Sequence, residues 1–249
     1  MGSDFNKLKR LTGEAISRYR MIEAGDRILV ALSGGKDSFV LMEVLDALRK
    51  RAPVEFELIA GTFDPGFADF GTAEIGRYCR ERGWEHRVAS LDIPAILRER
   101  SFEESPCVLC SRLRRGHLYR LAAESGCGKL ALGQHLDDII TSFLMSLCRG
   151  QGVTTMAPNV APDAPDHPRV IRPLALAPES LIRTCAAEFD LPAAGACKYA
   201  GQVEAGDRAA FGRLVDELEN RIPGVRGNIR HSLSRLEAAH LLDPRFMKF

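Results

Sequence analysis

The chain has 249 residues, of which 45% are hydrophobic and 27% are charged, and its net charge at pH 7 is +1. This composition is typical of a globular protein with a sizeable core, and it excludes a disordered or strongly basic protein. The sequence contains neither a signal peptide nor an apolar run that could span a bilayer, which predicts a cytoplasmic location and no membrane partner. Seven cysteines, an odd number, favour metal ligands or buried thiols over a disulfide framework.

Strands and helices alternate along most of the chain. The expected strands lie at residues 27–32, 55–63, 84–91, 129–132 and 170–174. The expected helices between and after them lie at residues 39–50, 72–82, 109–125 and 178–189. This rhythm predicts an α/β protein with a doubly wound, Rossmann-like parallel sheet, in which ligands bind at the carboxyl ends of the strands. The proline-rich stretch at 157–168 is expected to be an exposed loop.

Three parts are expected along the chain. Residues 1–25 predict an amphipathic lead-in helix that covers one edge of the main domain. Residues 26–195 form that domain, with a Cys-x-x-Cys helix inserted in it. Residues 196–249 carry a cysteine loop and two helices, at 207–221 and 228–239, as a small helical C-terminal appendage.

A glycine turn joins the first strand to the first helix of the sheet. Residues 29–38 read Leu-Val-Ala-Leu-Ser-Gly-Gly-Lys-Asp-Ser. Adjacent glycines let backbone N–H groups approach a bound phosphate, the serines add hydroxyl donors, and the lysine adds a mobile positive charge. The Walker motif is excluded, because its glycines are separated by four residues. The candidate phosphate-binding residues are Ser33, Gly34, Gly35, Lys36, Asp37 and Ser38.

Two cysteines stand at the start of a predicted helix. Cys107 and Cys110 supply half of a metal site at this spacing, and Cys197, in a glycine-containing loop, is the candidate third ligand. A redox pair, a structural zinc site and inert thiols are the alternatives, although the chain offers neither a thioredoxin-like setting nor a second Cys-x-x-Cys. The other cysteines, which we expect to be small buried side chains, are Cys79, Cys127, Cys148 and Cys185.

The block Gly-Gln-His-Leu-Asp-Asp at 133–138 follows the fourth strand and opens a helix that runs to Leu147. Asp137 and Asp138 could cap that helix, but their place at a strand end favours a Mg²⁺ or substrate role. His135 fits equally well as a group that orients a phosphate and as a structural histidine.

Four arginines lie close together without an acidic neighbour. They are Arg112, Arg114, Arg115 and Arg120. A solvated helix face is the usual explanation of such a run. Because it follows the cysteine pair, we favour contact with nucleic-acid phosphates.

The glycine turn matches the Ser-Gly-Gly-x-Asp-Ser signature of the PP-loop ATP pyrophosphatases, which it resembles fully. The chain is similar to the tRNA 2-thiocytidine biosynthesis family from about residue 8 to residue 244. It shares with that family the order of five motifs: the glycine turn, the Cys-x-x-Cys pair, the 133–138 block, Ile-Arg-Pro-Leu at 171–174 and the later cysteine. That family usually carries a further cysteine where this chain has Ala200, and this puts the route of sulfur in question.

The resemblance implies particular ligands and roles. It implies ATP on the glycine turn with Gly133 and His135, Mg²⁺, and catalytic roles for Lys36 and Asp138. It implies a [4Fe-4S] cluster on Cys107, Cys110 and Cys197. Of the four arginines, we expect Arg112, Arg114 and Arg115, which follow the cysteine pair most closely, to contact the phosphates of the tRNA.

The activity implied by the resemblance is ATP-dependent tRNA thiolation. The enzyme would adenylate the C2 oxygen of a tRNA pyrimidine, with cytidine favoured, and replace that oxygen with sulfur. The expected partners are tRNA and a sulfur donor, either a cysteine desulfurase or free sulfide, and a homodimer is left open. The alternatives are PP-loop enzymes that make 2-thiouridine or lysidine, and a non-catalytic RNA module that binds nucleotide and metal.

Overall fold

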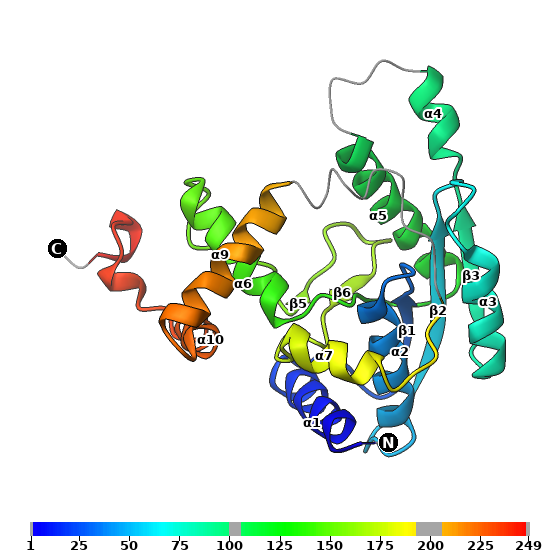
Figure 1. Cartoon of the computed structure of the whole chain (residues 1–249), viewed down its shortest axis with the longest axis horizontal. Coiled ribbons are helices and arrows are strands. Elements are labelled where there is room, and N and C mark those ends of the chain that lie inside the picture. Colours follow the sequence, from blue (N-terminus) through cyan, green and yellow to red (C-terminus); the bar gives the residue numbers. More distant parts are fainter. Residues whose placement is uncertain (1, 100–105, 193–205, 248–249) are drawn as a thin grey trace.

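A six-stranded sheet forms the centre of the protein, with strand order β3-β2-β1-β4-β6-β5 (Figure 1). The computed structural model describes residues 2–99, 106–192 and 206–247. The strands are β1 Asp26–Ala31, β2 Phe56–Asp64, β3 His86–Ser90, β4 Lys129–Ala131, β5 Asn159–Val160 and β6 Arg169–Ile171. β5 runs antiparallel to β6, and the other neighbouring strands are parallel. The predicted doubly wound α/β fold is thereby confirmed.

Helices cover both faces of this sheet. They are α1 Ser3–Arg18, α2 Lys36–Arg49, α3 Thr72–Glu81, α4 Ile93–Glu99, α5 Pro106–Glu124, α6 Leu136–Cys148, α7 Glu179–Ala186, α9 Asp207–Arg221 and α10 Val225–Leu233. The apolar residues of α1, α2, α3 and α7 form one core with the sheet, and those of α4 and α5 form a second core on the other face. None of the described helices is both long enough and apolar enough to cross a membrane.

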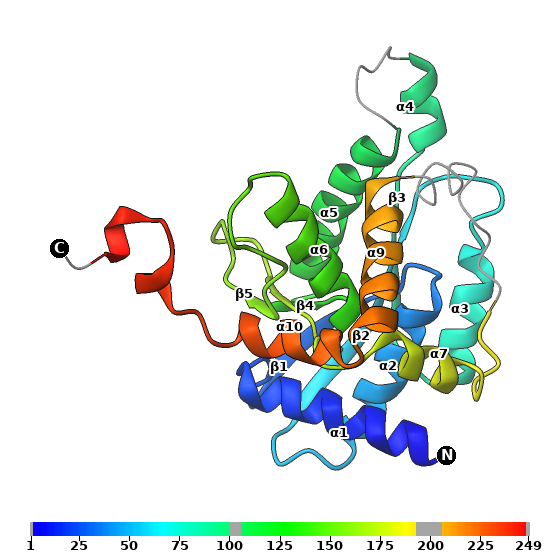
Figure 2. The ribbon, with the colours of Figure 1, turned by 60° about the vertical axis from the view of Figure 1, so that its left-hand side comes forward.

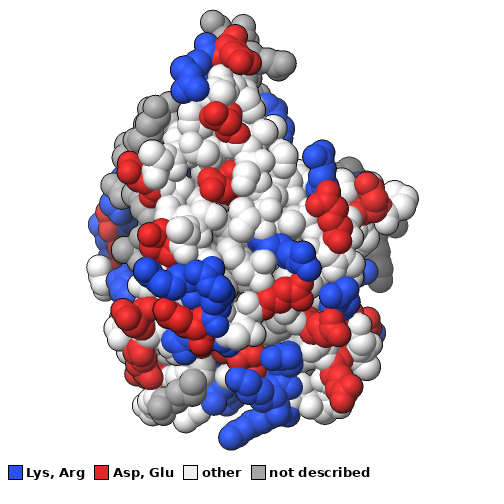
Figure 3. Space-filling model, turned by 90° about the vertical axis from the view of Figure 1, so that its right-hand side faces the viewer, with Lys and Arg blue, Asp and Glu red and all other residues white. Residues whose placement is uncertain are grey.

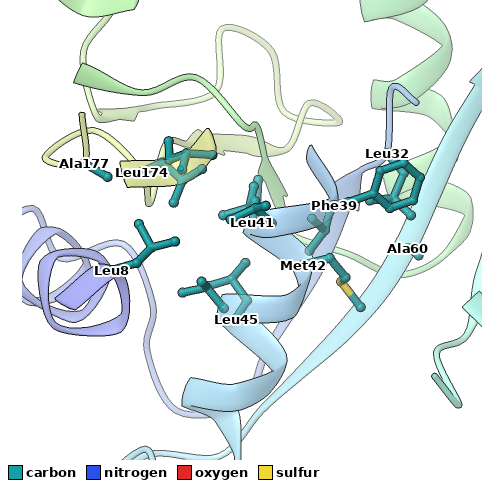
Figure 4. Close-up of a cluster of buried hydrophobic side chains, with 14 of the residues drawn as sticks. Leu8, Leu32, Phe39, Leu41, Met42, Leu45, Ala60, Leu174 and Ala177 are labelled. Carbon is teal, nitrogen blue, oxygen red and sulfur yellow. The ribbon is translucent and has the colours of Figure 1, made fainter. Parts of the chain in front are cut away.

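The larger core is centred on α2. Its Phe39, Leu41 and Leu45 are fully buried, and Figure 4 shows them between β1, β2 and the apolar side of α1. Leu8 of α1 and Leu174, which follows β6, close the same cluster. Burying such side chains stabilises the fold by roughly 1.5–3 kcal/mol each, so α2 is held firmly and its first turn has a fixed place.

The two candidate loops meet where the strand order changes direction. β1 pairs with β2 on one side and with β4 on the other, and Val30 lies opposite Ala131. The glycine turn follows β1, and the 133–138 block follows β4. Both loops therefore leave neighbouring carboxyl ends of the sheet, which is where doubly wound folds bind ligands.

Several expected elements differ from the structure. The helix expected at 228–239 is α10, which ends at Leu233, and a separate 3₁₀ helix follows at residues 238–240. The 157–168 stretch is not all loop, because β5 pairs with β6 and Asn159 Nδ2 donates to Tyr19 O over 2.8 Å. The lead-in helix ends at Arg18 and not near residue 25, since Arg20 takes a left-handed conformation with φ 49°. β5 was missed because a two-residue strand leaves no hydrophobic period in the sequence.

The C-terminal helices lie away from the sheet. α9 and α10 pack against α6, as Figures 1 and 2 show. Beyond them two short 3₁₀ helices, η1 Ala238–His240 and η2 Pro244–Phe246, extend from the body of the protein.

Candidate nucleotide and thiolation site

The glycine turn brings backbone N–H groups to the carboxyl end of β1. Gly34 has φ 84°, a left-handed conformation that glycine adopts without steric cost. Gly35 is the N-cap of α2 and has no side chain to cap it. The first turn of α2 therefore keeps N–H groups for an anion, as a phosphate site requires.

Ser38 closes this turn from within. Its hydroxyl donates to Gly35 O over 2.7 Å, and it accepts from Ser33 N over 3.1 Å. The Ser38 side chain is buried, whereas Ser33 is exposed. The two serines predicted to contact phosphate thus differ, since the Ser38 proton is used inside the turn and Ser33 faces solvent.

Lys36 lies between two carboxylates. Its Nζ is 3.0 Å from Glu179 Oε1 and 3.1 Å from Asp37 Oδ1. Burial alone would lower the pKa of Lys36, but the hydrogen bond to Glu179 and the charge of Asp37 raise it above its ordinary value. Lys36 is therefore a full positive charge, held in a defined direction at the start of α2.

Glu179, at the start of α7, was not found by sequence reasoning. Burial would raise its pKa, but hydrogen bonds from Lys36 and Arg183 lower the pKa to about 2. The signal that could have found it is weak, since Glu179 is 143 residues from Lys36 and belongs to no recognised motif.

The loop after β4 packs directly onto the first turn of α2. Gly133 lies so close that a Cβ there would come within 3.1 Å of Ser38 N. His135 is buried and caps α6, because its Nδ1 accepts from Asp138 N while Asp138 Oδ2 accepts from His135 N. His135 was expected either to orient a phosphate or to have a structural role, and these two hydrogen bonds give it a structural role.

The adjacent aspartates contact arginines of the C-terminal helices. Asp137 Oδ1 accepts from Arg226 Nε over 2.7 Å, and Asp138 Oδ1 accepts from Arg208 Nη2 over 3.2 Å. The other oxygen of Asp137 accepts from Glu179 N over 2.7 Å. Both carboxylates thus neutralise arginines and cap helices, and sequence reasoning missed this link to the appendage.

A cavity of about 350 Å³ opens between α6, α7, α9 and α10. Its walls carry both signs of charge. The charged residues among its lining are Asp137, Asp138, Glu179, Arg208, Asp216 and Arg226. Because Glu179 also contacts Lys36, this cavity adjoins the glycine turn.

The described part of the chain holds only some of the predicted cysteine ligands. Cys107 and Cys110 fall in the first turns of α5, and Cys110 is partly exposed. Cys197 and the side chain of Cys107 lie outside the described residues. Within the described residues, no three His, Cys, Asp or Glu side chains are close enough to hold a metal. The cluster assignment stays a prediction.

The other cysteines divide in two. Cys79, Cys127 and Cys185 are buried as expected, and burial raises the pKa of each thiol. Cys148 was expected to be buried, but it is exposed at the last residue of α6.

The predicted arginine surface lies on the solvent side of α5. Arg112, Arg114, Arg115 and Arg120 are all exposed. On the face that Figure 3 shows, beside α3 and β3, positive and negative side chains are interspersed without one continuous basic patch. With a net charge of +1, the chain has no strong overall positive field, so contact with nucleic-acid phosphates would have to depend on local groups.

The fold and the glycine turn define a class of nucleotide-binding protein. Residues 6–190 match a family model described as the PP-loop domain. Curated relatives cover nearly the whole chain. The tRNA-cytidine(32) 2-sulfurtransferase of Syntrophotalea carbinolica is 40% identical over 98% of this chain and 95% of its own length. That of Geobacter sulfurreducens is 39% identical over 96% and 93%. The chain therefore belongs to the tRNA 2-thiocytidine biosynthesis family of PP-loop proteins.

Solved structures share the fold. The U34-tRNA thiolase NcsA from Methanococcus maripaludis, described with its [4Fe-4S] cluster, has a TM-score of 0.73 and 22% identity, covering 99% of this chain and 85% of its own. An NH₃-dependent NAD synthetase from Campylobacter jejuni has a TM-score of 0.52 and 14% identity, covering 94% of each chain. At these identities the likeness concerns the fold alone.

Proposed function

We propose that this chain is an ATP-dependent tRNA sulfurtransferase, which replaces the C2 oxygen of a cytidine in tRNA with sulfur. The relatives that match along nearly the full length are named for this reaction at cytidine 32. The observation that supports the proposal most is the glycine turn at the switch point of the sheet, with Lys36 beside the uncapped start of α2. Such a helix start suits the phosphates of ATP.

The reaction has two steps. In the first, the C2 oxygen of cytosine forms a bond to the α-phosphorus of ATP, and the bond to pyrophosphate breaks. Lys36 and the N–H groups of the turn offset the charge that builds on the phosphates. In the second, a sulfide sulfur forms the bond to C2, and the C–O bond breaks with AMP as the leaving group. The base must leave its stack, since C2 is inaccessible within a helix.

Carboxylates have the remaining proposed roles, in catalysis and in binding Mg²⁺. Asp138 is the proposed catalytic carboxylate, and it must exchange Arg208 for the substrate, because Oδ1 contacts that arginine in the structure. Asp37 Oδ1 is buried, and within the described part of the chain its close partner is Lys36 Nζ at 3.1 Å, so it suits the Mg²⁺ that accompanies ATP once Lys36 turns to the phosphates. Asp137 and Asp138 were the first candidates for this cation, but arginines already neutralise both.

The cysteines supply the sulfur chemistry. Residues three apart in a helix share a face, so Cys107 and Cys110 fit as two thiolate ligands at the start of α5. A [4Fe-4S] cluster held by Cys107, Cys110 and Cys197 would keep one iron open to bind sulfide. The sulfide would then come from a cysteine desulfurase or from free sulfide.

The tRNA and the cellular setting complete the proposal. The exposed arginines of α5, with Arg112, Arg114 and Arg115 at its start, contact tRNA phosphates near the cysteine pair. The enzyme works in the cytoplasm, where its tRNA substrate is made and used. The proposal is compatible with a homodimer but does not require one, since a single chain carries every residue assigned here.

The test is release of pyrophosphate from ATP by the purified protein, with and without tRNA. We expect release that depends on tRNA, and Lys36→Ala should lower it by at least about a hundredfold, because the loop backbone stays while its charge is lost. Lys50→Ala, at the exposed end of α2, is the matched control and should keep wild-type rates. Absence of release would leave a non-catalytic RNA module. Because lysidine-forming enzymes share the adenylation step, a brown colour of the anaerobic preparation, which only the iron-sulfur enzyme should show, separates thiolation from lysidine formation.

A further inference from the structure

Arg226 stands at the centre of the contact between the C-terminal helices and the main domain. It lies in the first turn of α10, and 22% of its side chain is exposed. Its Nε donates to Asp137 Oδ1 over 2.7 Å, its Nη1 lies 3.5 Å from Glu219, and its Nη2 contacts Asp216. One guanidinium of α10 therefore contacts three carboxylates, one from α6 and two from α9.

Asp137 also forms a hydrogen bond with the start of α7. Its second oxygen, Oδ2, accepts from the backbone N–H of Glu179 over 2.7 Å. Pro178, the N-cap of α7, has no side chain that can accept a hydrogen bond from the first N–H groups of the helix. Asp137, which belongs to α6, accepts that hydrogen bond in its place. The position of Glu179 at the start of α7 thus depends on the position of Asp137.

Glu179 in turn holds the lysine of the glycine turn. Its Oε1 lies 3.0 Å from Lys36 Nζ. A continuous series of direct contacts therefore runs from Arg226 through Asp137 and Glu179 to Lys36. Every step is a hydrogen bond between described residues, and the steps join four separate helices: α10, α6, α7 and α2.

We propose that Arg226 is a positioning residue, which sets the direction of Lys36 toward the phosphates through Asp137 and Glu179. The inference rests on the proposed role of Lys36 in binding ATP. Its consequence is that the C-terminal helices, which lie beside the 350 Å³ cavity, share control of nucleotide binding with the glycine turn. A change in how these helices pack on α6 would reach Lys36 without contact between Arg226 and the nucleotide.

The expected effect is a loss of preorganisation. A lysine that is not held must be ordered when ATP binds, which weakens binding by about twofold to tenfold for one long side chain. Arg226→Gln should therefore raise the Kd for ATP by about that factor. Glu179→Ala should do the same, and the double variant should bind no more weakly than Glu179→Ala alone, because both changes break one series of contacts.

The test is calorimetric titration of the full chain with ATP in EDTA, which removes any contribution of Mg²⁺. Arg221→Gln, an exposed arginine at the end of α9, is the matched control and should bind like the wild type. Arg226→Lys keeps the charge and should raise the Kd less than Arg226→Gln. If the Arg226→Gln protein does not fold, Arg226→Lys takes its place in the comparison with the double variant.

Three results would overturn the inference. Unchanged ATP binding by Arg226→Gln would show that Lys36 is held without it. Multiplied effects in the double variant would show that Arg226 and Glu179 act separately. Tighter binding would show that Glu179 competes with phosphate for Lys36. Failure of the wild type to bind ATP would overturn the proposed function as well, whereas each of these three leaves that function standing.

Discussion

Gly133 and Ser38 bring the two loops of the site into backbone contact. A Cβ at position 133 would lie 3.1 Å from Ser38 N, and at the same distance from the carbonyl carbon of Asp37. The neighbouring atoms are main chain at the start of a helix that is buried along one side, so they cannot move aside easily. This close approach fixes the distance between the carboxyl ends of β1 and β4.

Gly133→Ala should therefore damage nucleotide binding and stability together. Inserting a methyl group against a packed backbone costs about 1–3 kcal/mol, and the shift falls on the first turn of α2. ATP titration and urea unfolding measure the two effects. Gly128→Ala, one residue before β4 with open space around the added Cβ, is the control and should change neither. Wild-type ATP binding by Gly133→Ala would contradict the account of the two loops.

A buried carboxylate on α2 gives the stability of the fold a specific pH dependence. Glu43 accepts from the Tyr78 hydroxyl over 2.6 Å, and burial raises the pKa of Glu43 above its ordinary 4.5. Because the folded pKa is the higher one, this contribution to stability is present below pH 4.5 and is lost as pH rises through the folded value. Glu43→Gln keeps an oxygen for Tyr78 but cannot ionise.

The stability of the wild type should therefore fall relative to Glu43→Gln as pH rises above 4.5. Urea unfolding of both proteins at a series of pH values measures the difference. If the free energy of unfolding of the two proteins changed with pH in the same way, Glu43 would titrate alike in the folded and unfolded protein.

The arginines of α5 should carry part of the affinity for tRNA. Arg114→Glu combined with Arg115→Glu should weaken binding and lower the salt slope of log K by about 2, since each lost phosphate contact removes about one unit. Filter binding at several salt concentrations measures the slope. Arg77→Glu with Arg80→Glu, exposed on α3 across the sheet, makes the same charge change as the control. An unchanged slope would make the α5 arginines a solvated helix face.

Most of the fold could be predicted from the sequence, because its strands are apolar runs between clear turns and the glycine turn is a local motif. The carboxyl-end position of both loops followed from the alternation of strand and helix. The partners of the charged groups did not follow. Glu179 reaches Lys36 across 143 residues, and Arg226 reaches Asp137 across 89. Local sequence carries no trace of such ion pairs, whose members meet only after the helices have packed.

The cysteines offer a choice between metal binding and packing. Changing Cys107, Cys110 or Cys197 to serine should remove iron, sulfide and the broad visible absorption together, because a three-thiolate cluster has no spare protein ligand. Ala200 cannot substitute for a lost thiolate. Cys185→Ser is the control, since burial raises the pKa of that thiol to about 11 and keeps it an apolar neutral group. Anaerobic protein with stoichiometric zinc and no iron would contradict the cluster.

The proposed reaction leaves 2-thiocytidine in tRNA. Mass spectrometry of the nucleosides in tRNA from a strain that lacks this gene tests it most directly. We predict that 2-thiocytidine is lost, and that the wild-type chain restores it whereas Lys36→Ala does not. Undiminished 2-thiocytidine in that strain, with the loss of 2-thiouridine or lysidine in its place, would contradict the proposed reaction.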